Sequence, residues 1–138
     1  MEFISHNVSE TEQFAFELAS KISSPRVICL TGDLGAGKTA FTRGFARYFG
    51  IEKGVSSPTF IIMHRYNGRE VINHYDLYRI ADFDELLDIG FEEQIESGIS
   101  IIEWPDNFME YLPEDKIVIR ITRLGDNERK IQYEDTCN

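Results

Sequence analysis

Short apolar runs alternate with segments of helical periodicity through most of the chain. Residues 2–5 (EFIS) predict a short first strand, and residues 26–31 (RVICLT) predict a second, buried strand. Between them, apolar residues recur every four positions, which predicts a helix over about 10–22 with one buried stripe. The stripe consists of Phe14, Leu18 and Ile22. Ser9 followed by Glu12 fits a capping box at the start of this helix.

The middle of the chain predicts a further helix and a hairpin. The helix is expected from Lys38 to near Gly50, because glycine commonly follows the last residue of a helix. Asn67-Gly68 is the strongest short signal for a hairpin turn, and it lies between two runs with strand character. Residues 60–66 and 70–74 are therefore predicted to pair antiparallel.

The last third of the chain combines helical and strand patterns. Residues 81–97 alternate acidic and apolar side chains in a helix-like way, and residues 99–103 predict a buried strand. Residues 116–134 predict a second hairpin with its turn at 125–127. Strands that alternate with helices favour an α/β fold. We expect a mixed sheet that is flanked by helices and extended by two antiparallel hairpins.

Length and composition are those of a soluble globular protein. The chain has 138 residues, of which 42% are hydrophobic and 28% charged, so a single domain over residues 1–138 is the simplest expectation. No apolar run reaches the roughly 18 residues of a membrane helix, and we predict no membrane partner. The two cysteines do not suggest a disulfide framework, and the first residues carry no export signal. A cytoplasmic location is therefore predicted.

The negative charge is concentrated in one segment, which we call the acidic block. Residues 81–115 contain twelve Asp and Glu residues and no Lys or Arg. Such a segment repels a phosphate backbone, so direct binding of nucleic acid is not predicted. Two interpretations remain: a solvated face that keeps the protein in solution, or a docking surface for a basic partner.

The sequence GDLGAGKT at 32–39 fits the phosphate-binding pattern G-x-x-x-x-G-K-[ST], with a predicted strand before it and a predicted helix after it. Glycines let the backbone turn its N–H groups toward phosphate oxygens, and the helix directs its positive end at them. Lys38 is predicted to reach the β- and γ-phosphates, and the Thr39 hydroxyl to bind Mg²⁺. The residues predicted to surround the phosphates are Gly32, Asp33, Leu34, Gly35, Ala36, Gly37, Lys38, Thr39 and Ala40.

Phosphate transfer or hydrolysis also needs groups on the far side of the metal ion. Glu103 follows an apolar run and fits a metal-binding carboxylate at the end of a buried strand, although an ordinary acid at a strand end is an equal alternative. Asp76 fits a group that orients water or a metal-bound water, or else a turn residue. Thr59 fits a hydroxyl that approaches the metal from the γ-phosphate side, or else one that satisfies a turn after Pro58. His74 is more simply a packed histidine.

Two classes of nucleotide enzyme find no support. A guanine-specific GTPase needs D-x-x-G and [NT]-K-x-D, and neither pattern occurs. A kinase of small anionic substrates commonly has an arginine-rich lid, and the acidic block has no arginine.

Four segments in order and spacing resemble one family. GDLGAGKT at 32–39, SPTF at 57–60, HYDLYR at 74–79 and IIEWPD at 101–106 are together similar to the bacterial TsaE family of small P-loop ATPases. The resemblance covers nearly the whole chain and implies a P-loop NTPase fold. It implies ATP and Mg²⁺ as cofactors, TsaB and TsaD as partner proteins, and a role in the threonylcarbamoyl modification of tRNA adenosine 37. tRNA itself is then only an indirect partner.

The same resemblance implies roles for particular residues. Glu103 and Thr39 would hold Mg²⁺, while Asp76 and Thr59 would complete the catalytic side. Trp104, Thr11 and Arg129 would lie near the nucleotide. The ATP cycle would reset a TsaB–TsaD complex between turnovers, with slow hydrolysis by the chain alone. An alternative of another class is a nucleotide-gated binding module, in which ATP occupancy rather than hydrolysis drives assembly with the partners.

Overall fold

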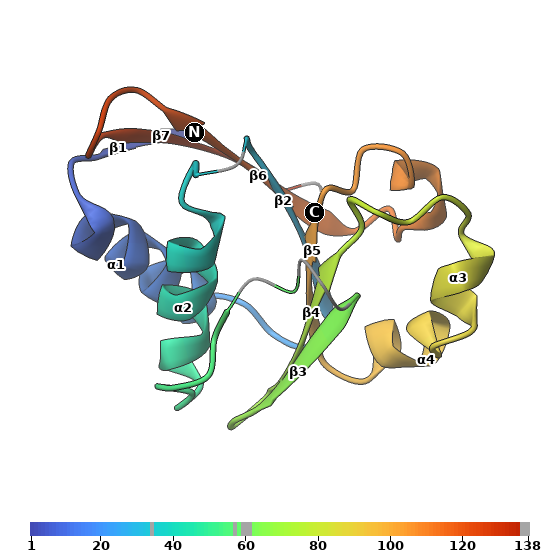
Figure 1. Ribbon diagram of the computed structural model, residues 1–138. Coiled ribbons are helices and arrows are strands. Elements are labelled where there is room, and N and C mark those ends of the chain that lie inside the picture. Colours follow the sequence, from blue (N-terminus) through green and yellow to red (C-terminus); the bar gives the residue numbers. More distant parts are fainter. Residues whose placement is uncertain (34, 57, 59–61, 136–138) are drawn as a thin grey trace.

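The computed structural model describes all residues except 34, 57, 59–61 and 136–138. The described chain forms three layers, with the sheet between two groups of helices (Figure 1). In chain order the elements are β1 (Glu2–Ser5), α1 (Val8–Ala19), β2 (Arg26–Thr31), α2 (Lys38–Tyr48), β3 (Met63–Asn67), β4 (Val71–Asp76), α3 (Asp84–Leu87), α4 (Phe91–Glu96), β5 (Ile99–Glu103), the 3₁₀ helix η1 (Met109–Tyr111), β6 (Lys116–Arg123) and β7 (Arg129–Asp135).

The sheet is mixed, as the sequence predicts. Its strand order is β1-β7-β6-β2-β5-β4-β3. The neighbouring strands β6, β2, β5 and β4 are parallel, and they form the centre of the sheet. Antiparallel strands extend it on both sides: β3 pairs with β4, and β7 pairs with both β6 and β1. Both predicted hairpins are therefore confirmed in their pairing, and the residues 60 and 61 expected in the first lie outside the described part.

Each face of the sheet has its own hydrophobic core. α1 and α2 lie side by side over one face, and α3, α4 and η1 lie over the other (Figure 1). The first core includes Phe41, Phe45 and Ile28, and the second includes Tyr75, Phe91 and Ile102. β2 and β5 contribute side chains to both cores, which explains why they read as continuous apolar runs rather than as alternating ones.

The first helix starts earlier than the sequence predicts. Its N-cap is Asn7, whose side-chain oxygen accepts a hydrogen bond from the Glu10 backbone N–H at 2.9 Å. The predicted Ser9–Glu12 capping box is therefore wrong, because Asn7 offers the same chemistry two residues earlier. The carboxylate of Glu12 instead accepts hydrogen bonds from Arg43 and Arg47 of α2. The helix ends at Ala19, so Ile22 packs on the core from beyond it.

The helix-like segment at 81–97, the first half of the acidic block, does not form one continuous helix. Gly90 adopts a left-handed conformation, with φ of 84°, and separates α3 from α4. Eleven of the twelve acidic side chains in residues 81–115 are exposed, and Glu103 is the exception. Burial thus distinguishes Glu103 from the other carboxylates of the acidic block.

Two further observations concern the whole described chain. No helix in it is long and apolar enough to cross a membrane. Cys29 is buried in β2 as a free thiol, and burial raises its pKa to about 11, so it has little thiolate character at neutral pH.

Candidate nucleotide-binding site

The candidate site lies where three parallel strands end side by side. In the register of the sheet, Leu30 of β2 is opposite Glu103 of β5, and Glu103 is opposite Asp76 of β4. The phosphate-binding loop follows β2 directly. Its residues and the carboxylates of Glu103 and Asp76 therefore lie together at the carboxyl ends of these strands. Ligands of open α/β sheets bind at such carboxyl ends. The sheet thereby brings together three segments that are far apart in sequence.

The loop has the backbone that its glycines predict. Gly32 has a φ of 148°, and a Cβ atom at this position would lie 2.5 Å from the Ile121 carbonyl oxygen of β6. Gly37 has a φ of 108° and is the N-cap of α2, with no side-chain hydrogen bond to the first turn. The first N–H groups of α2 are thus left without a side-chain cap, and a helix start of this kind favours an anion.

Lys38 is a buried cation beside the carboxylate of Glu103. Its side chain is 6% exposed, and the ammonium nitrogen has no hydrogen-bond partner among the described residues. The nearest carboxylate oxygen, Glu103 Oε1, is 3.8 Å away. Burial lowers the pKa of Lys38, while the negative charges of Glu103 and Asp76 oppose that shift. A buried ammonium without acceptors is costly, so phosphate oxygens at this place would satisfy it.

Trp104 forms one wall beside that ammonium. Its ring centroid is 4.0 Å from Lys38 Nζ, a cation–π distance, and 5.0 Å from the ring centroid of Tyr78. Trp104 has a φ of 56°, which is the left-handed region and is strained for a bulky residue. Strain of this kind is held in place by its surroundings and clusters at functional sites. Trp104 thus lies beside Lys38 of the phosphate loop, and its predicted place near the nucleotide stays a prediction.

The two carboxylates differ in their surroundings. Glu103 is 3% exposed; its Oε1 faces Lys38, and its Oε2 lies 2.5 Å from Nε2 of His74. Asp76 is 8% exposed, and its Oδ1 accepts a hydrogen bond from the Tyr78 backbone N–H at 2.9 Å. Asp76 therefore acts at least partly as the turn residue that the second interpretation predicts. It lies opposite Glu103 at the end of β4, and its role toward water or metal stays a prediction.

His74 is a residue of the candidate site that the sequence pattern does not identify as one. It is fully buried in β4 and in direct contact with Glu103. A signal does exist: His74 and Asp76 are two positions apart on one strand, so they face the same side of the sheet. Without the register between β4 and β5, that spacing does not distinguish a site residue from a packed one.

Arg129 contacts the phosphate loop from the last hairpin. Its Nε donates a hydrogen bond to the Ala36 carbonyl at 2.9 Å, and its Nη2 donates to the Gly35 carbonyl at 3.2 Å. Its Nη1 donates to carbonyls of its own turn, at Gly125 and Glu128. The guanidinium therefore joins the turn to the loop, and a direct contact with the nucleotide stays a prediction.

We expect Arg129→Gln to raise the Kd for ATP by about tenfold, because the loop loses two charge-assisted hydrogen bonds that hold its backbone. Calorimetry with a non-hydrolysable ATP analogue measures the effect. Arg123→Gln is the matched control, since among the described residues the Arg123 side chain bonds only Gly125 and Asp126 of the exposed turn. Equal affinities of the two variants would show that the bridge to the loop is unimportant.

The remaining predicted residues are placed as follows. Thr39 and Ala40 lie in the first turn of α2, and Thr39 is half-buried. Thr11 is 2% exposed, and its hydroxyl oxygen lies 2.7 Å from that of Ser5, so its place near the base or ribose stays a prediction. Leu34 and Thr59 lie outside the described residues. Asp33 is exposed in the loop.

Mg²⁺ fits this donor set in one particular way. The described residues contain no group of three His, Cys, Asp or Glu side chains that would hold a metal by itself. Mg²⁺ is commonly bound through one or two carboxylates together with substrate phosphates and water. In such an arrangement the Thr39 hydroxyl and Glu103 Oε1 would be the protein ligands. Phosphate oxygens would accept hydrogen bonds from the Lys38 ammonium, which has no hydrogen-bond acceptor among the described residues.

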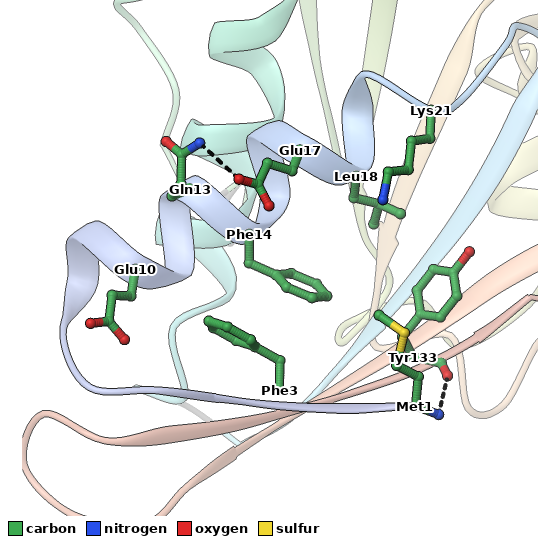
Figure 2. Close-up of a pocket in the computed structure, with 9 residues that line it drawn as sticks. All are labelled: Met1, Phe3, Glu10, Gln13, Phe14, Glu17, Leu18, Lys21 and Tyr133. Carbon is green, nitrogen blue, oxygen red and sulfur yellow. Dashed lines mark hydrogen bonds between the residues drawn. The ribbon is translucent and has the colours of Figure 1, made fainter.

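A separate apolar pocket lies elsewhere on the molecule. It occupies about 440 Å³ between α1 and the sheet edge formed by β1 and β7. Phe3, Phe14, Leu18 and Tyr133 line it, with Glu10 and Glu17 on α1 among its polar residues (Figure 2). Its lining includes no residue of the phosphate loop and neither site carboxylate. The pocket is therefore not the nucleotide site.

The parallel central strands and the glycine-rich loop between β2 and α2 are those of a P-loop NTPase fold. The family model of the threonylcarbamoyl adenosine biosynthesis protein TsaE matches residues 5–131. The chain belongs to the TsaE family.

Individual relatives agree with the family match. The TsaE protein of Bacillus subtilis is 42% identical over 129 residues, covering 92% of this chain and 80% of the relative. That of Treponema pallidum is 33% identical, covering 95% of this chain and 98% of the relative. The crystal structure of Bacillus subtilis YdiB superposes with a TM-score of 0.82 at 35% identity, covering all of this chain and 86% of that one. The predicted family and fold are both confirmed.

Proposed function

We propose that this protein is a Mg²⁺-dependent ATPase that supports the threonylcarbamoyl modification of tRNA adenosine 37 together with TsaB and TsaD. Its ATP cycle resets the complex of those proteins between turnovers. The observation that carries the ATPase role is a buried Lys38 ammonium that lies 3.8 Å from Glu103 Oε1 of β5 and has no hydrogen-bond acceptor among the described residues. The names of its relatives support the place in tRNA modification.

In this proposal, different residues of the site bind the phosphates, hold Mg²⁺ and orient the attacking water. The loop from Gly32 to Gly37 and the start of α2 bind the phosphates through backbone N–H groups, and Lys38 neutralises their charge. Bound Mg²⁺ supplies charge stabilisation of the transferred phosphoryl group. Thr39 and Glu103 orient that ion, and Asp76 orients the attacking water from the neighbouring strand. Trp104 covers the ammonium of Lys38 and limits access of bulk water to it.

The acidic block supports docking on proteins rather than on tRNA. Its exposed carboxylates cover α3, α4 and the segment around η1, on the face of the sheet opposite α1 and α2 (Figure 1). Negative charge at this density repels the tRNA backbone. The acidic block therefore attracts a partner protein with a basic surface, and the chain acts on tRNA only through that partner.

Steady-state hydrolysis tests the proposal. We expect the purified chain to hydrolyse ATP slowly with Mg²⁺, to lose that activity when the metal is removed with EDTA, and to turn over faster when TsaB and TsaD are added. The control is Lys38→Met, which removes the charge that contacts the phosphates. Rates that stay unchanged in the presence of partners that bind the chain would contradict the partner-dependent cycle. Failure to bind ATP would contradict the ATPase role itself.

A further inference from the structure

A hydrogen-bonded chain of three buried side chains begins at Glu103, the proposed ligand of Mg²⁺. Glu103 Oε2 lies 2.5 Å from Nε2 of His74, and Nδ1 of the same imidazole lies 3.2 Å from the Tyr66 hydroxyl. Exposure is 3% for Glu103, 0% for His74 and 7% for Tyr66. The chain runs across β5, β4 and β3, which are neighbours in the sheet. Buried polar groups in such a chain fix one another's orientation.

Tyr66 anchors the far end of this chain to backbone. Its hydroxyl donates a hydrogen bond to the Ser56 carbonyl at 3.1 Å and accepts one from the Ser56 N–H at 3.4 Å. Ser56 belongs to the connection between α2 and β3. The imidazole is thus held from behind by a hydroxyl that bonds both backbone polar groups of Ser56 and also lies 3.3 Å from Nδ1 of His64.

The two oxygens of Glu103 have separate partners. Oε1 faces the Lys38 ammonium at 3.8 Å, and Oε2 faces His74. Among the described residues, Oε2 has no other hydrogen-bond partner. The imidazole therefore determines which way the carboxylate plane is turned, and with it the direction in which Oε1 presents its lone pairs to the site.

We propose that His74, held in place by Tyr66, is the positioning residue of the Glu103 carboxylate, and that it sets the affinity of the site for Mg²⁺. This inference rests on the proposed function, in which Glu103 holds the metal ion. Outer partners of metal-binding carboxylates commonly change metal affinity or activity by about 10- to 100-fold when they are removed. His74 does not touch the nucleotide in this role and acts only through Glu103.

Three substitutions separate positioning from mere packing. In His74→Gln the amide nitrogen occupies the place of Nε2 and keeps the bond to Glu103. In His74→Asn the amide reaches only the place of Nδ1, so the bond to Glu103 is lost although a polar side chain remains. Tyr66→Phe keeps the ring and removes the hydroxyl that holds the imidazole.

The measurement is a titration of Mg²⁺ into the complex of each full-length variant with a non-hydrolysable ATP analogue, followed by calorimetry. We expect the Mg²⁺ concentration at half saturation to rise about tenfold in His74→Asn and to stay within about twofold in His74→Gln. Tyr66→Phe should fall between them. Affinity for the analogue without Mg²⁺ should not change, and kcat at limiting Mg²⁺ should fall in the same order.

Thermal unfolding of each variant shows whether it folds, and Glu103→Gln calibrates the assay. If Glu103→Gln weakens Mg²⁺ binding but His74→Asn and Tyr66→Phe do not, the positioning role is overturned and the proposed function stands. If His74→Gln and His74→Asn lose Mg²⁺ affinity equally, the imidazole serves packing and the inference is also wrong. If Glu103→Gln itself leaves Mg²⁺ binding unchanged, the proposed role of Glu103 fails, and the inference fails with it.

Discussion

Glu103→Gln is expected to lower the rate of ATP hydrolysis by about 100-fold while leaving ATP bound. The amide keeps the shape of the side chain and its contact with His74 but removes the negative charge that faces Lys38 and that would hold Mg²⁺ in the proposed function. Loss of that charge affects the phosphoryl-transfer step, whereas the phosphate loop and Lys38 still hold the nucleotide. Single-turnover hydrolysis and calorimetric ATP binding, measured on the same preparation, separate the two effects.

The same variant decides between the ATPase cycle and the nucleotide-gated module. Asp76→Asn serves as a second variant at the carboxyl end of the neighbouring strand β4. It also removes a negative charge while keeping the shape of the side chain. If the cycle is the functional event, both variants should bind ATP and fail to support tRNA modification in a reconstituted system with TsaB and TsaD. Full modification by variants shown not to hydrolyse ATP would establish occupancy as the functional event.

Gly44→Ala is expected to destabilise the fold by about 2 kcal/mol or more and to lower the Tm by roughly 10 °C. Gly44 lies at the contact between α2 and α1, where an added Cβ atom would be 2.2 Å from the Glu12 carbonyl oxygen. Because that neighbour is backbone, α1 must move away from α2. The ion pairs of Glu12 with Arg43 and Arg47, at 3.2 and 3.4 Å, are then strained as well.

Gly125→Ala provides the matched control for that prediction. A Cβ atom at Gly125 meets nothing within 4 Å, and the residue lies in the exposed turn of the last hairpin. Thermal unfolding followed by circular dichroism should show a large shift for Gly44→Ala and almost none for Gly125→Ala. A higher Tm for Gly44→Ala would mean that the usual gain in helix propensity outweighs the clash and that the helices separate at little cost.

Local sequence patterns predict most of the elements and part of the site. The strands at 26–31 and 99–103 are short apolar runs bounded by breakers, and the structure has them as β2 and β5. The phosphate loop is equally local, because its glycines and Lys38 act through their own backbone and the helix that follows. Asn67-Gly68 and the residues near 125–127 predict hairpins for the same reason.

Errors arise where several local solutions compete. Asn7 and Ser9 both offer an N-cap for α1, and only the observed hydrogen bond to Glu10 shows that Asn7 is used. Residues 81–97 have helical periodicity, yet Gly90 takes a left-handed conformation and separates two short helices. Periodicity predicts the type of an element more reliably than its ends.

The amino-acid sequence alone predicts the family, the α/β class and the phosphate-loop motif. The family follows from four short motifs in their order and spacing, and each motif consists of residues that are close together in the chain. The rest of the site is assembled only in the folded protein. The register of β4 on β5 places His74 against Glu103, and the packing of the last hairpin brings Arg129 to the loop carbonyls. These contacts join residues far apart in sequence, and the pairing of strands across the sheet fixes them, which no local pattern specifies.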